Sequence, residues 1–113
     1  MNEQLITLLN KLNNKTIVFK DVLAFIDEHY QHHPTAFKNG DTYNEATQNQ
    51  GSARVFAFAQ INNLSKEDTL QLFAEHYQAV QDTPGGTEHQ NIRQFMAYGW
   101  AGITFEGKAL EPR

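Results

Sequence analysis

The sequence has no cysteine, which excludes disulfide bonds and metal sites built on thiolates. It also has no apolar run long enough to span a bilayer, and no charged start followed by an apolar stretch, the pattern of a secretory signal peptide. Nine lysines and arginines are scattered among 13 acidic residues without a basic stripe, so nucleic acid is not an expected partner. These absences predict a soluble, cytoplasmic domain that needs no membrane, metal or cofactor.

The length of 113 residues fits one domain, 1–113. A chain of this size buries roughly two-thirds of the surface that its unfolded form exposes, which is enough for a core of its own. Eight phenylalanines, four tyrosines and one tryptophan make the chain too aromatic for disorder. Its polar residues are to a large extent asparagine and glutamine, whose amides both donate and accept hydrogen bonds and therefore suit turns, caps and polar networks.

Apolar spacing predicts two helices in the first third of the chain. The first has an apolar face at positions i, i+3, i+4 and i+7, formed by Leu5, Leu8, Leu9 and Leu12. Asn13 and Asn14 end it. The second helix begins at about Asp21 and must end before Pro34, because the residue that precedes a proline avoids the α region.

Three further helices are predicted in the rest of the chain. From Ser52 to Ile61 the sequence is apolar nearly all round, as in a buried central helix. Ser65-Lys66-Glu67-Asp68 matches a capping box that opens a helix with a buried stripe as far as Val80. Pro84-Gly85-Gly86 breaks the chain, and Thr87-x-x-Gln90 is a second capping box that opens the last helix.

The remaining segments carry turn and strand signals. Asn39-Gly40 is a strong turn signal that follows the apolar pair Ala36-Phe37, and 103–105 alternates like a strand. These two segments are candidates for pairing. The predicted fold class is therefore mainly α, a compact bundle of about five helices with a small two-stranded β element as an optional addition (α+β).

Polar residues in two distant parts of the chain form the candidate binding site. These residues are Asn44, Glu45, Asn49 and Ser52 ahead of the central helix, and His89, Asn91, Arg93 and Trp100 in the last third. In a functional interpretation they line a pocket, with His89 as acid or base and Arg93 binding a carboxylate or phosphate. Glu88 argues against a bound anion, since it places a negative charge at the helix start.

A structural interpretation explains the same residues without a ligand. Asparagine and glutamine bond readily to nearby backbone, so 44–50 caps and ties a turn, and Arg93 pairs with Glu45 or Asp41 to clamp the last helix to it. Trp100 then belongs to the core, as a lone tryptophan in a small domain usually does.

Other chemistry finds little support. His29, His32 and His33 share the end of a helix but lack a carboxylate at metal-site spacing, and interaction with the helix dipole explains them. No metal site is predicted. Of the two serines, Ser65 is a helix cap and Ser52 stands at a helix start, so no catalytic residue is assigned.

Several motifs read together resemble the HopJ type III effector family over nearly the whole chain. They are Pro34-Thr35-Ala36-Phe37-x-Asn39-Gly40, Asn49-x-Gly51-Ser52, Phe56-Ala57-Phe58-Ala59 and Gly86-Thr87-x-His89-Gln90-Asn91-Ile92-Arg93-x-Phe95-Met96-x-x-Gly99-Trp100-x-Gly102-Ile103-x-Phe105-Glu106-Gly107. The resemblance implies one HopJ-like domain and an effector-like role. It implies no catalytic residue.

Three hypotheses of function follow. The first is a non-catalytic, effector-like or regulatory protein that binds a protein partner through the surface around its aromatic–glycine segment. The second is a cytoplasmic domain that binds a small ligand, and the third is a small hydrolase or transferase that uses His89 and Arg93. The family name implies secretion into a host cell by a type III system as the alternative to a cytoplasmic location. A leucine-faced first helix and the lack of serine before Ser52 argue against an unfolded export leader.

Overall fold

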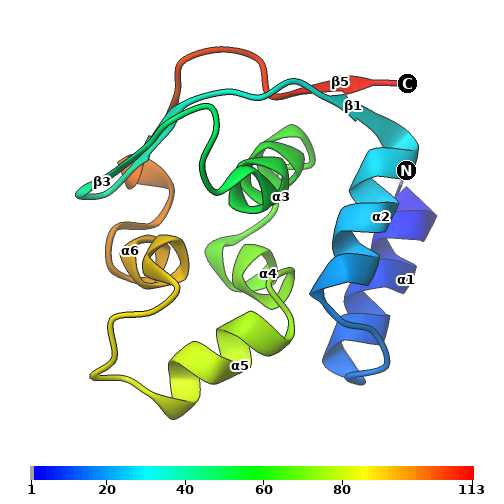
Figure 1. The fold of residues 1–113 in the computed structure, drawn as a ribbon. Coiled ribbons are helices and arrows are strands. Elements are labelled where there is room, and N and C mark those ends of the chain that lie inside the picture. The colour runs from blue at the N-terminus through cyan, green and yellow to red at the C-terminus, as the bar shows by residue number, and fades with distance from the viewer. Residues whose placement is uncertain (1) are drawn as a thin grey trace.

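The structure, a computed structural model, describes residues 2–113 as a layer of helices beneath two small sheets (Figure 1). The helices are α1 (Asn2–Asn13), α2 (Phe19–His29), α3 (Gln50–Ile61), α4 (Lys66–Gln71), α5 (Glu75–Asp82), α6 (Gln90–Tyr98) and the 3-10 helix η1 (Gly99–Gly102). The strands are β1 (Tyr30–His32), β2 (Phe37–Asn39), β3 (Thr42–Asn44), β4 (Ile103–Phe105) and β5 (Leu110–Pro112). The predicted mainly α fold with a small β part is confirmed.

Helix α3 forms the centre of the core, as its nearly continuous apolar sequence predicted. In Figure 1 it lies between α2 and α6, beneath the strands. Its buried residues are Ala53, Val55, Phe56, Ala57, Phe58 and Ala59. The ring of Phe56 is in contact distance of the rings of Phe37, Phe73 and Phe95, at centroid separations of 6.0, 5.4 and 5.0 Å. One side chain therefore joins the sheet, the turn between α4 and α5, and α6 into one core.

The three-stranded sheet has the order β3-β2-β4, all antiparallel. The predicted pairing of the segment at Phe37 with 103–105 is present, since Phe37 lies opposite Phe105. The Asn39-Gly40 signal forms the β2–β3 turn, and Gly40 has φ +58°. A Cβ there would overlap the Tyr98 ring, so the hairpin can lie this close to α6 only with a glycine.

A second sheet of two strands, β1 and β5, was not predicted from the sequence. It pairs Tyr30 with Pro112 and His32 with Leu110, so the segment after α2 lies beside the last strand. Arg113, which follows β5, bonds to the last turn of α2, from its backbone N–H to the His29 carbonyl at 3.0 Å and from Nε to the Asp27 carbonyl at 2.7 Å.

The prediction of one helix from Ser65 to Val80 is wrong, because the structure has two helices there, α4 and α5. The chain between them ends α4 with tight i→i+3 bonds and passes through Ala74 at φ 51°. Leu72 and Phe73, in the turn between the two helices, and Val80 of α5 are all buried in the core. Within residues 2–113, no helix is both long and apolar enough to cross a membrane.

Candidate functional site

Four asparagines form one hydrogen-bonded cluster, the amide network, which consists of Asn39, Asn44, Asn49 and Asn91. Asn44 Nδ2 donates to Asn91 Oδ1 at 3.1 Å, and Asn91 Nδ2 donates back to Asn44 Oδ1 at 3.0 Å. Asn49 Nδ2 donates to Asn44 Oδ1 at 2.7 Å, and Asn39 Nδ2 donates to Asn91 Oδ1 at 3.0 Å. The network therefore ties the β2–β3 hairpin and the start of α3 to the first turn of α6.

The network is buried, except for Asn49 at its end. Asn39 and Asn44 are 0% and 1% exposed, and Asn91 is 6% exposed. Asn39 Oδ1 is buried and finds no hydrogen-bond partner within residues 2–113. Buried amides stabilise a fold only while their bonds are formed, so this cluster specifies one arrangement of hairpin and helix.

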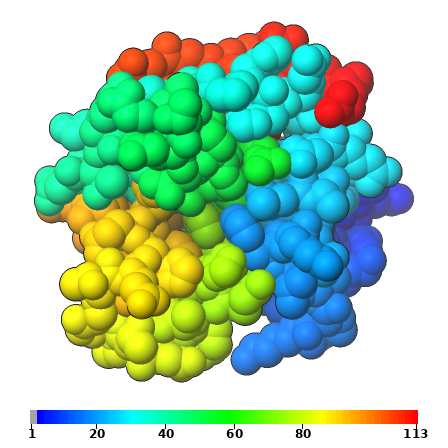
Figure 2. Space-filling view, viewed as in Figure 1, coloured from blue at the N-terminus to red at the C-terminus, as the bar shows by residue number. Residues whose placement is uncertain are grey.

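A cavity of about 390 Å³, the histidine cavity, opens beside this network. Its lining comes from the start of α2, the hairpin and the starts of α3, α5 and α6, whose segments approach one another on the face seen in Figure 2. The lining residues are Phe19, Thr42, Asn49, Gly51, Ser52, Phe73, His76, His89, Gln90, Asn91 and Ile92. None of these is an aspartate, glutamate, lysine or arginine, so its two histidines are the basic groups of the wall.

His76 and His89 lie side by side in this wall, with ring centroids 5.0 Å apart. The His76 ring also meets the edge of Phe19 at 4.9 Å. Among residues 2–113, His29 and His32 form ring hydrogen bonds, and His33 Nε2 lies 3.3 Å from Glu111 Oε1 without forming one. Within the same residues, the rings of His76 and His89 form no hydrogen bond and have no carboxylate at ion-pair distance. Their ring nitrogens are therefore available to a ligand.

Two helix starts border the histidine cavity, and both have unusual N-caps. Asn49 precedes α3 with φ 51° and His89 precedes α6 with φ 57°, both in the left-handed region and both without a side-chain cap. The second predicted capping box is therefore wrong. The helix begins at Gln90, whose Nε2 donates to the Thr87 carbonyl instead. The first box holds at its start, where Ser65 Oγ accepts from Asp68 N–H at 3.1 Å.

Arg93 does not pair with Glu45 or Asp41, so this part of the structural interpretation is wrong. Its guanidinium donates to the carbonyls of Glu88 and Thr83 at 2.6 and 2.8 Å, and thus closes the loop between α5 and α6. Residues 91 and 93 are about 200° apart around a helix, at roughly 100° per residue. The helix that turns Asn91 toward the amide network therefore turns Arg93 away from it.

The other predicted site residues lie outside the histidine cavity. Trp100 packs its ring on Phe95, with centroids 5.0 Å apart, and donates from Nε1 to the Leu64 carbonyl at 3.1 Å, so it belongs to the core. Glu45 is exposed, and its N–H bonds to Gln48 Oε1 at 3.1 Å. Of the eight predicted residues, the cavity lining brings together Asn49, Ser52, His89 and Asn91.

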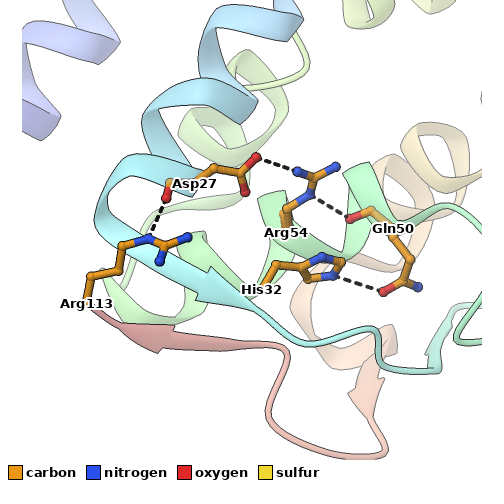
Figure 3. A network of polar contacts seen from close by, with 5 residues as sticks. All are labelled: Asp27, His32, Gln50, Arg54 and Arg113. Carbon is orange, nitrogen blue, oxygen red and sulfur yellow. Dashed lines mark hydrogen bonds and ion pairs between the residues drawn. The ribbon is translucent and has the colours of Figure 1, made fainter.

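Sequence reasoning missed His76 and Gln50. His76 lies just after the unpredicted break at Ala74, which sets the direction in which its ring points. Gln50 is a hub for the loop before α3, since its Oε1 accepts from Thr35 N–H at 3.0 Å and lies 3.2 Å from His32 Nε2. Figure 3 shows this contact beside the Asp27–Arg54 ion pair, whose atoms are 2.7 Å apart. The run of amides at 48–50 was the signal for such a hub.

Two exposed tyrosines have perturbed hydroxyl groups. The Tyr98 hydroxyl donates to Asp41 Oδ2 at 2.9 Å, and this hydrogen bond, with the charge of the same carboxylate, raises the pKa of Tyr98 above 10.0. The side chain of Glu106 beside the Tyr43 hydroxyl raises the pKa of Tyr43 in the same direction. Both pairs lie on the solvent side of the hairpin and α6. Within residues 2–113, no group of three or more His, Asp or Glu side chains is arranged to hold a metal ion.

Comparison with known proteins identifies relatives of this fold. The family model described as "HopJ type III effector protein" matches residues 4–110. The crystal structure of VPA0580, described as a protein of unknown function, is similar with a TM-score of 0.88 and 42% identity, over 95% of this chain and 92% of that chain. No curated protein matches the sequence.

Proposed function

The chain belongs to the HopJ type III effector protein family, and we propose that it is a non-catalytic, effector-like or regulatory protein that binds a small ligand in the histidine cavity. The observation that carries this proposal is the cavity of about 390 Å³, whose size is that of a small-molecule site. It holds two histidines whose rings form no hydrogen bond within residues 2–113, and these rings lie next to Phe19. Half of the residues predicted from the sequence contribute to its lining.

The composition of the cavity wall supports binding rather than catalysis. A histidine that acts as a general base works best with a nucleophile in reach and a second group that orients its ring. The lining holds Ser52 and both imidazoles, but no carboxylate that would orient either ring. Arg93, which the enzymatic hypothesis needs as an anion clamp, closes a loop elsewhere. The hydrolase or transferase hypothesis thus loses one of its two named residues.

The test of this proposal is a screen of small fragments by NMR, with the C–H signals of His76 and His89 as reporters. A fragment that occupies the cavity should shift both signals and raise the melting temperature, since binding to the native state adds stability. The variant His89→Gln should lose the effect, whereas His33→Gln, a matched change outside the cavity lining, should keep it. If no fragment shifts either signal, the proposal is wrong.

A protein-binding surface is the second candidate function, favoured by the two exposed tyrosines. Tyr43 and Tyr98 are 48% and 49% exposed, and the Tyr98 hydroxyl donates to Asp41 Oδ2 at 2.9 Å, so the Tyr98 ring is held in place at the surface. Tyrosine is enriched at the centres of protein interfaces. This places the candidate surface at Tyr98 rather than at Trp100, whose ring packs into the core. A pull-down in which Tyr98→Ala loses a partner that Trp100→Phe retains would support it, and equal recovery by both variants would contradict it.

A further inference from the structure

We infer that the ligand of the histidine cavity is a small acid with a planar ring, in which a carboxylate or phosphate lies against His76 and His89 and the ring lies against Phe19. This inference rests on the proposed function and names the class of ligand. Two features of the lining carry it, the presence of two basic side chains without an acidic one and the row of aromatic rings.

The ionisable side chains of the lining are its two histidines, so any charge that the wall itself carries is positive. His76 and His89 each offer a ring N–H, protonated imidazoles offer two, and Ser52 has a hydroxyl that also donates. The Asn91 oxygen is already used, because Oδ1 accepts from both Asn39 and Asn44. The amides of Asn49 and Gln90 are neutral groups that accept as well as donate. A ligand group that only accepts hydrogen bonds fits such a wall, and carboxylates and phosphates are groups of this kind.

No acidic side chain opposes this charge inside the cavity. Glu75, which precedes His76, points its carboxylate to the backbone N–H of Phe19 at 2.7 Å, and it is not part of the lining. Glu88, which the sequence suggested as an obstacle to an anion, is exposed, outside the lining, and its carbonyl accepts from Arg93. The objection raised from the sequence therefore does not hold for the histidine cavity.

The aromatic rings of the wall favour a planar body for the ligand. Phe19 stacks on Phe73 at 5.8 Å and meets His76 at 4.9 Å, and His76 meets His89 at 5.0 Å. Four rings thus follow one another at the spacing of aromatic pairs. Phe19 and His76 are half-buried and His89 is exposed, so part of this row is open to a ligand that extends it.

Three probes separate the parts of this inference. Benzoate has the ring and the acid, benzamide has the ring with a neutral group, and acetate has the acid alone. With a chelator present to remove adventitious metal, we expect benzoate to shift the His76 and His89 signals and to bind about tenfold or more tightly than either other probe, the factor expected for one hydrogen bond to a charged group. Ser52→Ala and His76→Gln should weaken the binding of benzoate. The matched control His33→Gln should bind benzoate as tightly as the unchanged protein.

The possible outcomes distinguish this inference from the proposed function. If benzamide binds as tightly as benzoate and shifts the same signals, the acid class is wrong while the cavity remains a ligand site. If acetate binds as tightly as benzoate, the prediction that the ligand has a planar ring is wrong. If none of the three probes shifts either histidine, this inference is overturned, and the wider fragment screen then decides whether the proposed function falls with it. A variant that unfolds is recognised by the loss of dispersion of its amide signals in the NMR spectrum. In that case the benzoate experiment is repeated with His89→Asn in its place.

Discussion

The side chains of Asn44 and Asn91 form a closed pair in which each amide donates to the oxygen of the other, at 3.1 and 3.0 Å. The pair joins the end of the β2–β3 hairpin to the first turn of α6, across 47 positions of the chain. It also fixes one wall of the histidine cavity, because Asn91 lines it. Scaffold and candidate site are therefore two sides of the same contact.

Removal of one member of this pair is expected to destabilise the fold. Asn91→Ala removes the side-chain oxygen that accepts from Asn39 and Asn44, and the amide that donates to Asn44 Oδ1, so the free energy of unfolding should fall by about 1–3 kcal/mol. Urea unfolding followed by circular dichroism measures it. The matched control is Asn10→Ala, at an exposed helical position, which should change stability little. Equal stability of the two variants would contradict a structural role for the amide network.

The hairpin turn is expected to tolerate no side chain at Gly40. Gly40→Ala combines a positive φ of +58° with a Cβ that overlaps the Tyr98 ring, and should lower the free energy of unfolding by about 2 kcal/mol or more. Gly85→Ala is the matched control, since nothing lies within 4 Å of its new Cβ. That variant should be neutral or slightly more stable. A Gly40→Ala protein as stable as the Gly85→Ala protein would show that the turn can move away from α6.

Arg93 is expected to stabilise the loop between α5 and α6 through the shape of its guanidinium. Arg93→Lys keeps the charge but cannot reach the Thr83 and Glu88 carbonyls together. The loss should be about 1 kcal/mol in stability, with faster hydrogen exchange in residues 83–88. Ligand-induced shifts of His89 should persist in this variant. If the variant loses those shifts while hydrogen exchange in the loop is unchanged, Arg93 takes part in ligand binding and this prediction is wrong.

The titration of Tyr98 is expected to depend on Asp41. Because its folded pKa lies above the ordinary value of 10.0, the phenol keeps its proton to higher pH in the folded chain than in the unfolded one. The stabilising contribution is therefore complete below pH 10 and is lost as the pH rises through the folded pKa. Asp41→Ala should lower the pKa of Tyr98 toward 10.0, measured from tyrosinate absorbance and assigned with Tyr98→Phe. An unchanged titration would show that the hydrogen bond is absent in solution.

Local patterns in the sequence predicted the parts of the fold that depend on local rules. The leucine spacing of α1, the apolar run of α3 and the Ser65 cap each depend on residues within a few positions of one another. The break at Ala74 does not, because an alanine with positive φ is unfavourable by itself and no local pattern around Ala74 predicts it. The pairing of β1 with β5 likewise depends on residues far apart in the sequence.

The sequence predicted several residues of the candidate site, but not how their side chains are arranged. Polarity alone selected Asn49, His89 and Asn91, and these do meet at one cavity. The direction of Arg93 depended on where the helix begins, and the true start at Gln90 follows an N-cap histidine in the left-handed region, which no sequence rule favours. His76 depended on the break at Ala74 and was therefore missed.

The β2–β3 turn has a consequence for the length of this segment. Side chains along a strand alternate between two faces, so one inserted residue between Asn39 and Thr42 would invert β3. Thr42 would then leave the cavity wall and Asn44 would point to solvent, while Asn91 would remain behind without its counterpart. Natural variants of this domain with longer hairpins should therefore add residues in pairs, or else carry a different amino acid where this chain has Asn91.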